Sequence, residues 1–269
     1  MPKISFFKNK AREVRKLLLT AAFKGRSAHI GSALSTVDVI VALYFGILNI
    51  NPKKSKDPKR DIFILSKGHG CLGLYATLAL KAYFSKNILL KYFKDGTTLA
   101  GHPVLNAQPG IESSTGSLGH GFPTAVGLAY GFKKQKRLNR VVTMISDGEC
   151  DEGATWEAAL AAPNFKLNNL TLVVDYNKIQ SFGTVKEVMD LEPLVKKWQD
   201  FGWNVIEING HDFRQILAAF KRAKAHKSGP TAIIAHTIKG KGVSFMENTL
   251  EWHYFNLDEA KLSKALAEL

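Results

Sequence analysis

The sequence predicts an α/β protein built on a parallel sheet with helices on both faces. Short apolar segments recur along the chain, and the stretches between them have the periodicity of helices. Strands that alternate with helices in this way form parallel sheets buried between two helical layers. The apolar segments are residues 62–65, 141–145, 170–174, 205–208 and 231–235.

The first part of the chain is predicted to be helical. Residues 9–24 place apolar side chains at the i, i+3, i+4, i+7 spacing of an amphipathic helix, and residues 35–44 form a second helix that we expect to pack beside it. Residues 51–60, NPKKSKDPKR, combine two prolines with charges and are predicted to be a lysine-rich surface loop. With 269 residues, 45% of them hydrophobic, the chain can bury a large core, and we expect a single domain over residues 1–269.

The charge and the cysteines bear on the class of protein. The formal net charge is +14, but the 37 Lys and Arg residues are scattered in ones and twos, which is typical of a solvated surface and argues against a nucleic-acid partner. Cys71 and Cys150 have no CxxC or zinc-ligand spacing, so we expect buried, reduced thiols and a cytoplasmic protein. We find no signal peptide and no apolar stretch long enough to span a bilayer, and therefore expect no membrane partner.

The loop at residues 146–148 leaves one predicted strand and enters a helix that we expect to begin near Ala154. Ligands of open parallel sheets bind beyond the carboxyl ends of the strands. Gly148 allows backbone amides to approach an anion at a helix N-terminus. The carboxylate of Asp147 would repel such an anion unless a divalent cation lies between them, so Asp147 is a candidate metal ligand.

The next strand is followed by a second candidate loop, thirty residues farther along the chain. Asn177 offers a neutral side-chain oxygen and Ile179 a backbone carbonyl, and neighbouring parallel strands would place them beside Asp147. Together with two phosphate oxygens and a water, these groups could complete the octahedral shell of Mg2+. Taken alone, either loop is more often a plain turn than a site.

Several motifs of this chain resemble those of one family. The pairing of Asp-Gly with an Asn about thirty residues later resembles the thiamin diphosphate motif, and the stretch SDGECDEG…LVVDYNKIQSFG is similar to transketolases. Other matches follow in the order of that family over nearly the whole chain: SAHIGSALS (27–35), LSKGHGCLGLY (65–75), GHP (101–103), STGSLGHGFPTAVGLAYG (114–131) and TIKGKGVSFMENTLEWH (237–253). The chain is thus identified as a member of the transketolase family that corresponds to its N-terminal half, which implies the diphosphate-domain fold of thiamin-diphosphate-binding proteins.

The resemblance implies thiamin diphosphate and Mg2+, or another divalent cation such as Ca2+ or Mn2+, as cofactors. Asp147, Asn177 and the Ile179 carbonyl would bind the metal, and the Gly148 amide would touch the diphosphate. The loop of Gly116, Ser117 and Leu118 would contact the aminopyrimidine ring. Ser146 stands where the family usually has glycine, which would matter if that position needs a positive φ.

The resemblance also implies roles for four histidines and an acid. His29 and His253 would transfer protons near the carbonyl oxygen of the substrate, His102 would hold the two-carbon donor, and His69 would lie near the cofactor. Imidazole suits proton transfer because its pKa lies near neutral pH. Glu152 matches a glutamate at a dimer interface. Glu149 and Asp151 are expected only to favour the start of the helix through its dipole.

The function that follows is that of the N-terminal subunit of a two-chain transketolase. It would transfer a two-carbon ketol unit from a ketose phosphate to an aldose phosphate with a complementary subunit that carries the pyrimidine-binding and C-terminal domains, and we expect an α2β2 assembly. One alternative is a subunit with a different sugar or with pyruvate as donor, like 1-deoxyxylulose-5-phosphate synthase. Another is a non-catalytic binding protein on the same fold. The KGKGVSFMEN…WH segment favours transketolase over the synthase.

Overall fold

A computed structural model, which describes residues 2–269, confirms the predicted fold class. Its single sheet has five parallel strands in the order β1-β2-β3-β5-β4. Each predicted strand is present, and no boundary differs by more than two residues. The strands are β1 (Ile62–Leu65), β2 (Val141–Ser146), β3 (Leu170–Tyr176), β4 (Asn204–Asn209) and β5 (Thr231–His236).

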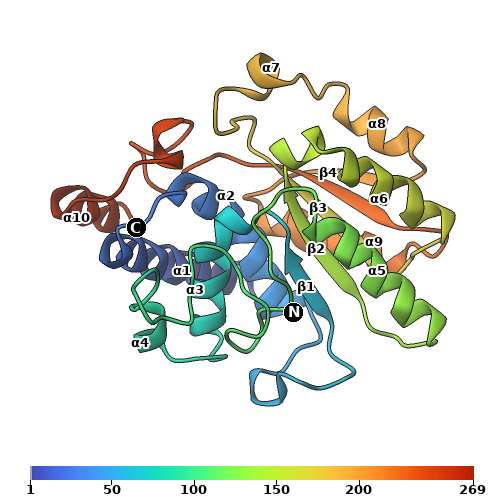
Figure 1. The fold of residues 1–269 in the computed structure, drawn as a ribbon, viewed down its shortest axis with the longest axis horizontal. Helices are drawn as coiled ribbons and strands as arrows, with labels where there is room; N and C mark the ends of the chain where they lie inside the picture. Colours follow the sequence, from blue (N-terminus) through green and yellow to red (C-terminus); the bar gives the residue numbers. More distant parts are fainter. Residues whose placement is uncertain (1) are drawn as a thin grey trace.

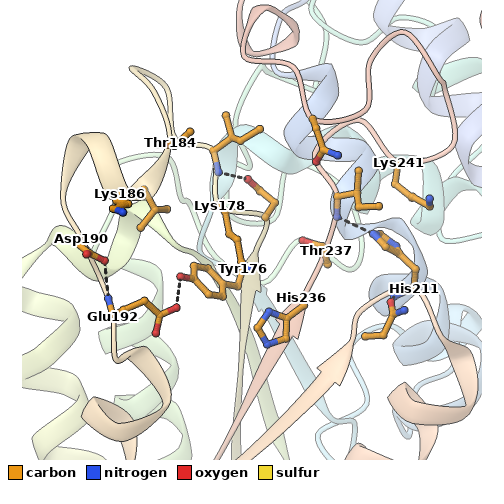
Figure 2. Close-up of a pocket in the computed structure, with 16 residues that line it drawn as sticks. Tyr176, Lys178, Thr184, Lys186, Asp190, Glu192, His211, His236, Thr237 and Lys241 are labelled. Atoms are coloured by element: carbon orange, nitrogen blue, oxygen red, sulfur yellow. Dashed lines mark hydrogen bonds between the residues drawn. The ribbon is translucent and has the colours of Figure 1, made fainter.

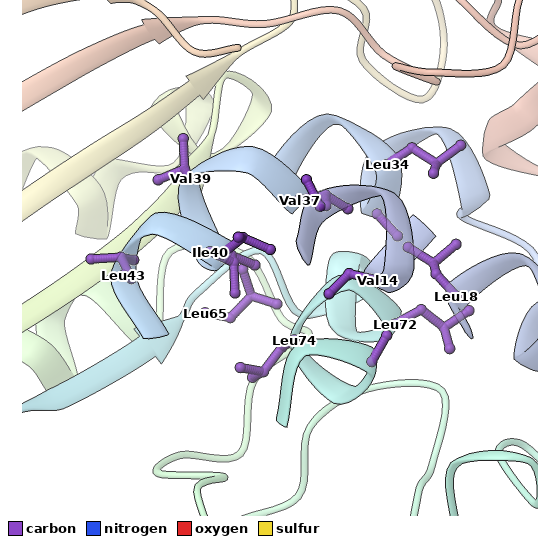
Figure 3. Packing of buried hydrophobic residues seen from close by; sticks show 14 of the residues in the cluster. Val14, Leu18, Leu34, Val37, Val39, Ile40, Leu43, Leu65, Leu72 and Leu74 are labelled. Atoms are coloured by element: carbon purple, nitrogen blue, oxygen red, sulfur yellow. The ribbon is translucent and has the colours of Figure 1, made fainter. Parts of the chain in front are cut away.

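One face of the sheet packs against helices from both the N-terminal and the C-terminal parts of the chain (Figure 1). Figure 3 shows side chains of three of these helices meeting Leu65 of β1 in a continuous apolar cluster. Val14 and Leu18 reach this cluster from the first helix, as the predicted apolar stripe requires. The helices on this face are α1 (Ile4–Gly25), α2 (Ile30–Ala42), α3 (Cys71–Leu80), α9 (Phe213–Ala225) and α10 (Glu259–Ala267).

The opposite face of the sheet packs against three other helices, so that the sheet is the middle layer of three (Figure 1). Successive strand residues alternate between the two layers. Ile62 and Ile64 face this second cluster, whereas Phe63 and Leu65 face the first. The helices of this face are α5 (Gly121–Lys134), α6 (Gly153–Asn164) and α8 (Leu194–Asp200). Two single-turn helices, α4 (Lys86–Leu89) and α7 (Val185–Val188), lie in connecting segments.

Helix α2 corrects two expectations. It begins at Ile30 rather than at residue 35, because its residues are buried all round and show no polar face that would mark the helix in the sequence. With the π-helical turn that continues it, the helix over Ile30–Ile47 is also long and apolar enough to cross a membrane by length and composition, contrary to the expectation that no such stretch exists. In the structure 83% of this window is buried within the protein, which is the environment of a core helix.

The register of the strands brings the candidate loops to one edge of the sheet. Ser146 of β2 pairs with Asp175 of β3, and Tyr176 of β3 pairs with His236 of β5. The segments that follow β2, β3 and β5 therefore emerge side by side. The predicted loop at residues 51–60 contains one short 3-10 turn, Pro52–Lys54, and is largely exposed.

Candidate active site

A cavity of about 370 Å³ lies at the carboxyl ends of β1, β2 and β3, and we call it the histidine cavity. Ser117, which is exposed, is the one predicted site residue that does not line it. The predicted residues that do line it are His29, His69, His102, Gly116, Leu118, Asp147, Gly148, Glu152, Asn177, Ile179 and His253.

Four histidines from separate segments converge in this cavity. The ring centroid of His29 lies 4.9 Å from that of His253, 5.7 Å from that of His69 and 5.9 Å from that of His102. The backbone of His29 has φ 63°, the left-handed region that non-glycine residues rarely adopt, and its N–H donates to the carbonyl oxygen of His253 at 2.9 Å. The constrained backbone at the start of α2 thus holds two of the imidazoles together.

The environment of the cavity keeps these imidazoles neutral at pH 7. Burial, with the positive charges of neighbouring groups, lowers the pKa of His29 from 6.5 to about 4 and that of His253 to about 3. Burial also lowers the pKa of His69 and His102. A neutral imidazole has one free nitrogen that can accept a proton or a hydrogen bond, which is the form that a general base needs.

The oxygen groups proposed as metal ligands lie on two neighbouring loops. Asp147 is 2% exposed and accepts hydrogen bonds from the N–H of Gly148 at 2.9 Å and that of Lys178 at 2.8 Å, so its carboxylate joins the loop after β2 to the loop after β3. Burial raises its pKa to about 6, so the ionised carboxylate is poorly stabilised by the protein alone and a cation beside it would be favourable. Within residues 2–269 no cluster of three or more His, Cys, Asp or Glu side chains could hold a metal. The other two predicted ligands accept hydrogen bonds within the protein: Asn177 Oδ1 accepts from the N–H of Ile179 at 3.1 Å, and the Ile179 carbonyl accepts from Lys239 Nζ at 3.2 Å.

Two buried lysines belong to the site but were not predicted. Lys67, fully buried after β1, forms an ion pair of 2.5 Å with Asp175 of β3. Lys239, fully buried after β5, donates to the carbonyl oxygens of Ile179 at 3.2 Å and Gln180 at 3.0 Å. Each lysine lies within three residues of the end of an apolar strand and precedes a glycine, in LSKG and TIKG, and this position was the available signal.

The loop around Gly116 is held against a histidine. Gly116 has φ 153°, and a Cβ there would lie 2.9 Å from Cδ2 of His102. The preceding residue, Thr115, fixes the loop to β1, because its hydroxyl donates to the carbonyl oxygen of Leu65 at 2.8 Å. A side chain at Gly116 would push this loop and His102 apart, which explains the need for glycine at this position.

The acidic stretch after β2 agrees with the predicted helix start and differs from its prediction at Glu149. Ser146 is the last residue of β2 and is not among the residues with positive φ, so serine is accommodated without strain. Gly148 begins a 3-10 turn, Gly148–Asp151, and α6 starts only at Gly153, close to the predicted Ala154. Glu149 does more than favour a helix start, because its side chain is fully buried and hydrogen-bonded to three segments. The buried thiols of Cys71 and Cys150 agree with the prediction.

A larger groove of about 1030 Å³ lies beside the histidine cavity and shares Asn177 and Ile179 with it. Figure 2 shows Tyr176, Lys178 and Glu192 on one side of this groove and His211 and Lys241 on the other. The groove contains none of the four converging histidines, so the histidine cavity is the better candidate for the active site.

Comparison with known proteins identifies several that are similar to this chain. The model of the family "Transketolase, thiamine diphosphate binding domain" matches residues 7–269. A 6-deoxy-6-sulfo-D-fructose transketolase subunit of Clostridium sp. (strain MSTE9) is 43% identical over 261 residues, which are 97% of this chain and 95% of that protein. An apulose-4-phosphate transketolase subunit of Phocaeicola vulgatus is 41% identical over 89% of this chain and 85% of its own length.

Longer proteins match over only part of their length. The human transketolase is 34% identical over 93% of this chain, but the match covers 40% of that protein. Among solved structures, a transketolase from Leishmania mexicana superposes with a TM-score of 0.91 at 28% identity, over 97% of this chain and 41% of that one. The chain therefore spans about 40% of the length of these transketolases.

Proposed function

The chain belongs to the transketolase family as an N-terminal subunit with the thiamin-diphosphate-binding domain, and we propose that it transfers a two-carbon ketol unit from a ketose phosphate to an aldose phosphate. One observation supports this most strongly. The four histidines lie in the same cavity as Asp147 and Asn177, although six separate parts of the sequence contribute these side chains. The whole chain is then one diphosphate-binding domain over residues 1–269.

We propose that Asp147, the amide oxygen of Asn177 and the Ile179 carbonyl bind a divalent cation, Mg2+ or a similar ion such as Ca2+ or Mn2+. The N–H of Gly148, which donates to the Asp147 carboxylate at 2.9 Å, would then donate to the diphosphate instead, and the loop of Gly116, Ser117 and Leu118 would contact the aminopyrimidine ring. The ammonium group of Lys239, which donates to the carbonyl oxygens of Ile179 and Gln180, would help to balance the negative charge of the diphosphate. Bound thiamin diphosphate supplies the carbon centre that cleaves a ketose next to its carbonyl group.

The histidines would handle protons and orient the sugar. His29 and His253 are neutral at pH 7 and adjacent, so either ring can accept a proton from a substrate hydroxyl and return it to a carbonyl oxygen. Lys239 Nζ lies 3.3 Å from Nδ1 of His253, which favours the tautomer with that nitrogen unprotonated. His102 and His69, whose ring centroids lie 5.9 Å and 5.7 Å from that of His29, would hold the donor and the cofactor.

We propose further that the subunit works with a complementary chain that carries the pyrimidine-binding and C-terminal domains, in an α2β2 assembly in the cytoplasm. Three relatives that match over most of their own length are named as subunits. At the rim of the histidine cavity, Phe182 is 82% exposed, and we propose that the partner covers this side chain. Glu152, exposed at the same rim, would lie at the twofold interface.

The first experiment measures cofactor binding by titration calorimetry. We expect the chain, purified with its complementary subunit, to bind thiamin diphosphate in the presence of Mg2+ and to lose binding in EDTA. Asp147→Asn should abolish metal-dependent binding, whereas Asp95→Asn, an exposed acid, should leave it unchanged. Binding that is indifferent to EDTA would refute the metal assignment.

The second experiment assigns the substrates. The relatives suggest 6-deoxy-6-sulfo-D-fructose, apulose 4-phosphate and, from the solved transketolases, xylulose 5-phosphate as donors to compare. We expect ketol transfer to at least one aldose phosphate by the two-chain complex and none by the chain alone. Full transfer by the isolated chain would refute the need for a partner.

A further inference from the structure

Glu149 is a fully buried carboxylate that receives hydrogen bonds from three segments of the chain. Its Oε1 accepts from the hydroxyl of Ser66, after β1, and from the N–H of Gly119 at 3.1 Å. Its Oε2 accepts from the N–H of Ser146 at 3.2 Å. The described contacts thus present three donors and no acceptor to this side chain, and an ionised carboxylate is the group that matches such a set.

Ser146 and Glu149 also bond to each other in both directions. The Ser146 hydroxyl accepts from the N–H of Glu149 at 3.2 Å, while the Glu149 carboxylate accepts from the N–H of Ser146. This reciprocal pattern has the S-x-x-E spacing and the two hydrogen bonds of a capping box, in front of a 3-10 turn whose N-cap is Asp147. The Ser146 hydroxyl therefore supplies an acceptor that a glycine at this position would lack.

The segments that Glu149 joins are the loops of the histidine cavity. Gly119 has φ 78° and directly follows the loop of Gly116 and Leu118, which lines that cavity. Ser66 precedes Lys67, and Ser146 precedes Asp147, and both of these neighbours also line the cavity. One buried carboxylate therefore fixes the loop at Gly116–Gly119 relative to the loop at Asp147.

We propose that Glu149, held by its capping box with Ser146, is a positioning residue that sets the spacing between the loop at Gly116–Gly119 and the metal loop at Asp147. This inference rests on the proposed function in one respect, that both loops contact one cofactor molecule. The geometry of the contacts does not depend on that premise. A cofactor bound at both ends loses affinity when the two loops can move independently, because binding must then order them.

The test compares Glu149→Gln with Glu157→Gln, the same change at an exposed position of α6. Glutamine has the same size, but its amide group would place N–H donors against one of the three donors that now face the carboxylate. In the full chain without cofactor, we expect hydrogen exchange of the Gly119 amide to become at least about tenfold faster in E149Q, since a buried charge-assisted hydrogen bond is lost. Exchange in E157Q should match the wild type.

Cofactor affinity is the second readout, measured by calorimetry on the complex with the partner subunit. We expect the Kd of thiamin diphosphate to rise about tenfold in E149Q, with an unchanged KM for the sugar. Ser146→Gly, which removes the hydroxyl together with its Cβ, should raise that Kd by a smaller factor of about three, and the double variant should bind no more weakly than E149Q alone. S146G also serves if E149Q does not fold.

The outcomes separate this inference from the proposed function. Unchanged Gly119 exchange and unchanged cofactor Kd in the variants would overturn the positioning role, while the wild type still binds cofactor. If the wild-type complex binds no thiamin diphosphate, the proposed function fails, and the exchange rates alone decide whether Glu149 holds the loop.

Discussion

Replacing Asp147 by asparagine should stabilise the metal-free chain while it removes metal-dependent cofactor binding. The side chain is almost fully buried, and the protein compensates its charge poorly. Burial, opposed in part by the positive charge of Lys67, raises the pKa of Asp147 from 3.8 to about 6. Keeping this carboxylate ionised at neutral pH therefore costs stability that a neutral amide would not cost.

The size of the expected stabilisation follows from the pKa shift of Asp147. About two pKa units correspond to about 3 kcal/mol at a pH well above 6. Asparagine has one side-chain oxygen, so one of the hydrogen bonds from Gly148 or Lys178 is lost, at about 1 kcal/mol. The net gain is about 2 kcal/mol, or a rise in Tm of about 5 °C for a chain of this length.

The assay is thermal unfolding of both proteins in EDTA at pH 8 and pH 5. Because the folded-state pKa of Asp147 is raised, the favourable contribution of this group to the free energy of unfolding is complete below pH 3.8 and is lost as the pH rises through about 6. The advantage of D147N should therefore be larger at pH 8 than at pH 5, and D95N should show none. With Mg2+ and thiamin diphosphate present, only the wild type should gain stability. A lower Tm for D147N in EDTA at pH 8 would refute the reasoning.

Three further predictions concern the network around the site. The carboxylate of Asp38 pairs with the buried guanidinium of Arg15 at 2.7 Å, and Asp38→Asn leaves this guanidinium without its anionic partner. Urea denaturation should show that the free energy of unfolding falls by about 4 kcal/mol, and an unchanged midpoint would contradict this. Lys239→Met removes the donor to the carbonyl oxygens of Ile179 and Gln180, in the loop after β3, and should raise the cofactor Kd at least about tenfold in calorimetry. An unchanged Kd would contradict this prediction. Because the pKa values of His29 and His253 are lowered, the contribution of these neutral rings to the stability of the cofactor-free chain is complete above pH 6.5 and falls as the pH drops toward about 4. In thermal melts over this range, His29→Asn should reduce the slope of Tm against pH. An unaltered slope would exclude His29 as its source.

The sequence by itself determined the layers of the fold and the positions of its functional loops. The apolar segments at 62–65 and 141–145 could be recognised because burial on both faces of a sheet demands a continuous apolar run, a purely local signal. The loop at Asp147 could be recognised only together with the other motifs that resemble the family, because an Asp-Gly pair taken alone is more often a plain turn. Helix α2 was placed too late in the chain for the converse reason: a helix that is buried all round has no periodic signal at its start.

The tertiary structure alone decided which side chains share the site and in what charge state. Lys67 and Asp175 are 108 residues apart in sequence, and only the packing of β1, β2 and β3 brings them to 2.5 Å. The order of the last two strands, with β5 between β3 and β4, places Lys239 beside the loop after β3, and no local pattern encodes that order. The low pKa of His253 and the buried contacts of Glu149 likewise arise from desolvation and from donors on distant segments. Local residue patterns report which segments are buried, whereas electrostatics depends on distances that exist only once those segments have packed.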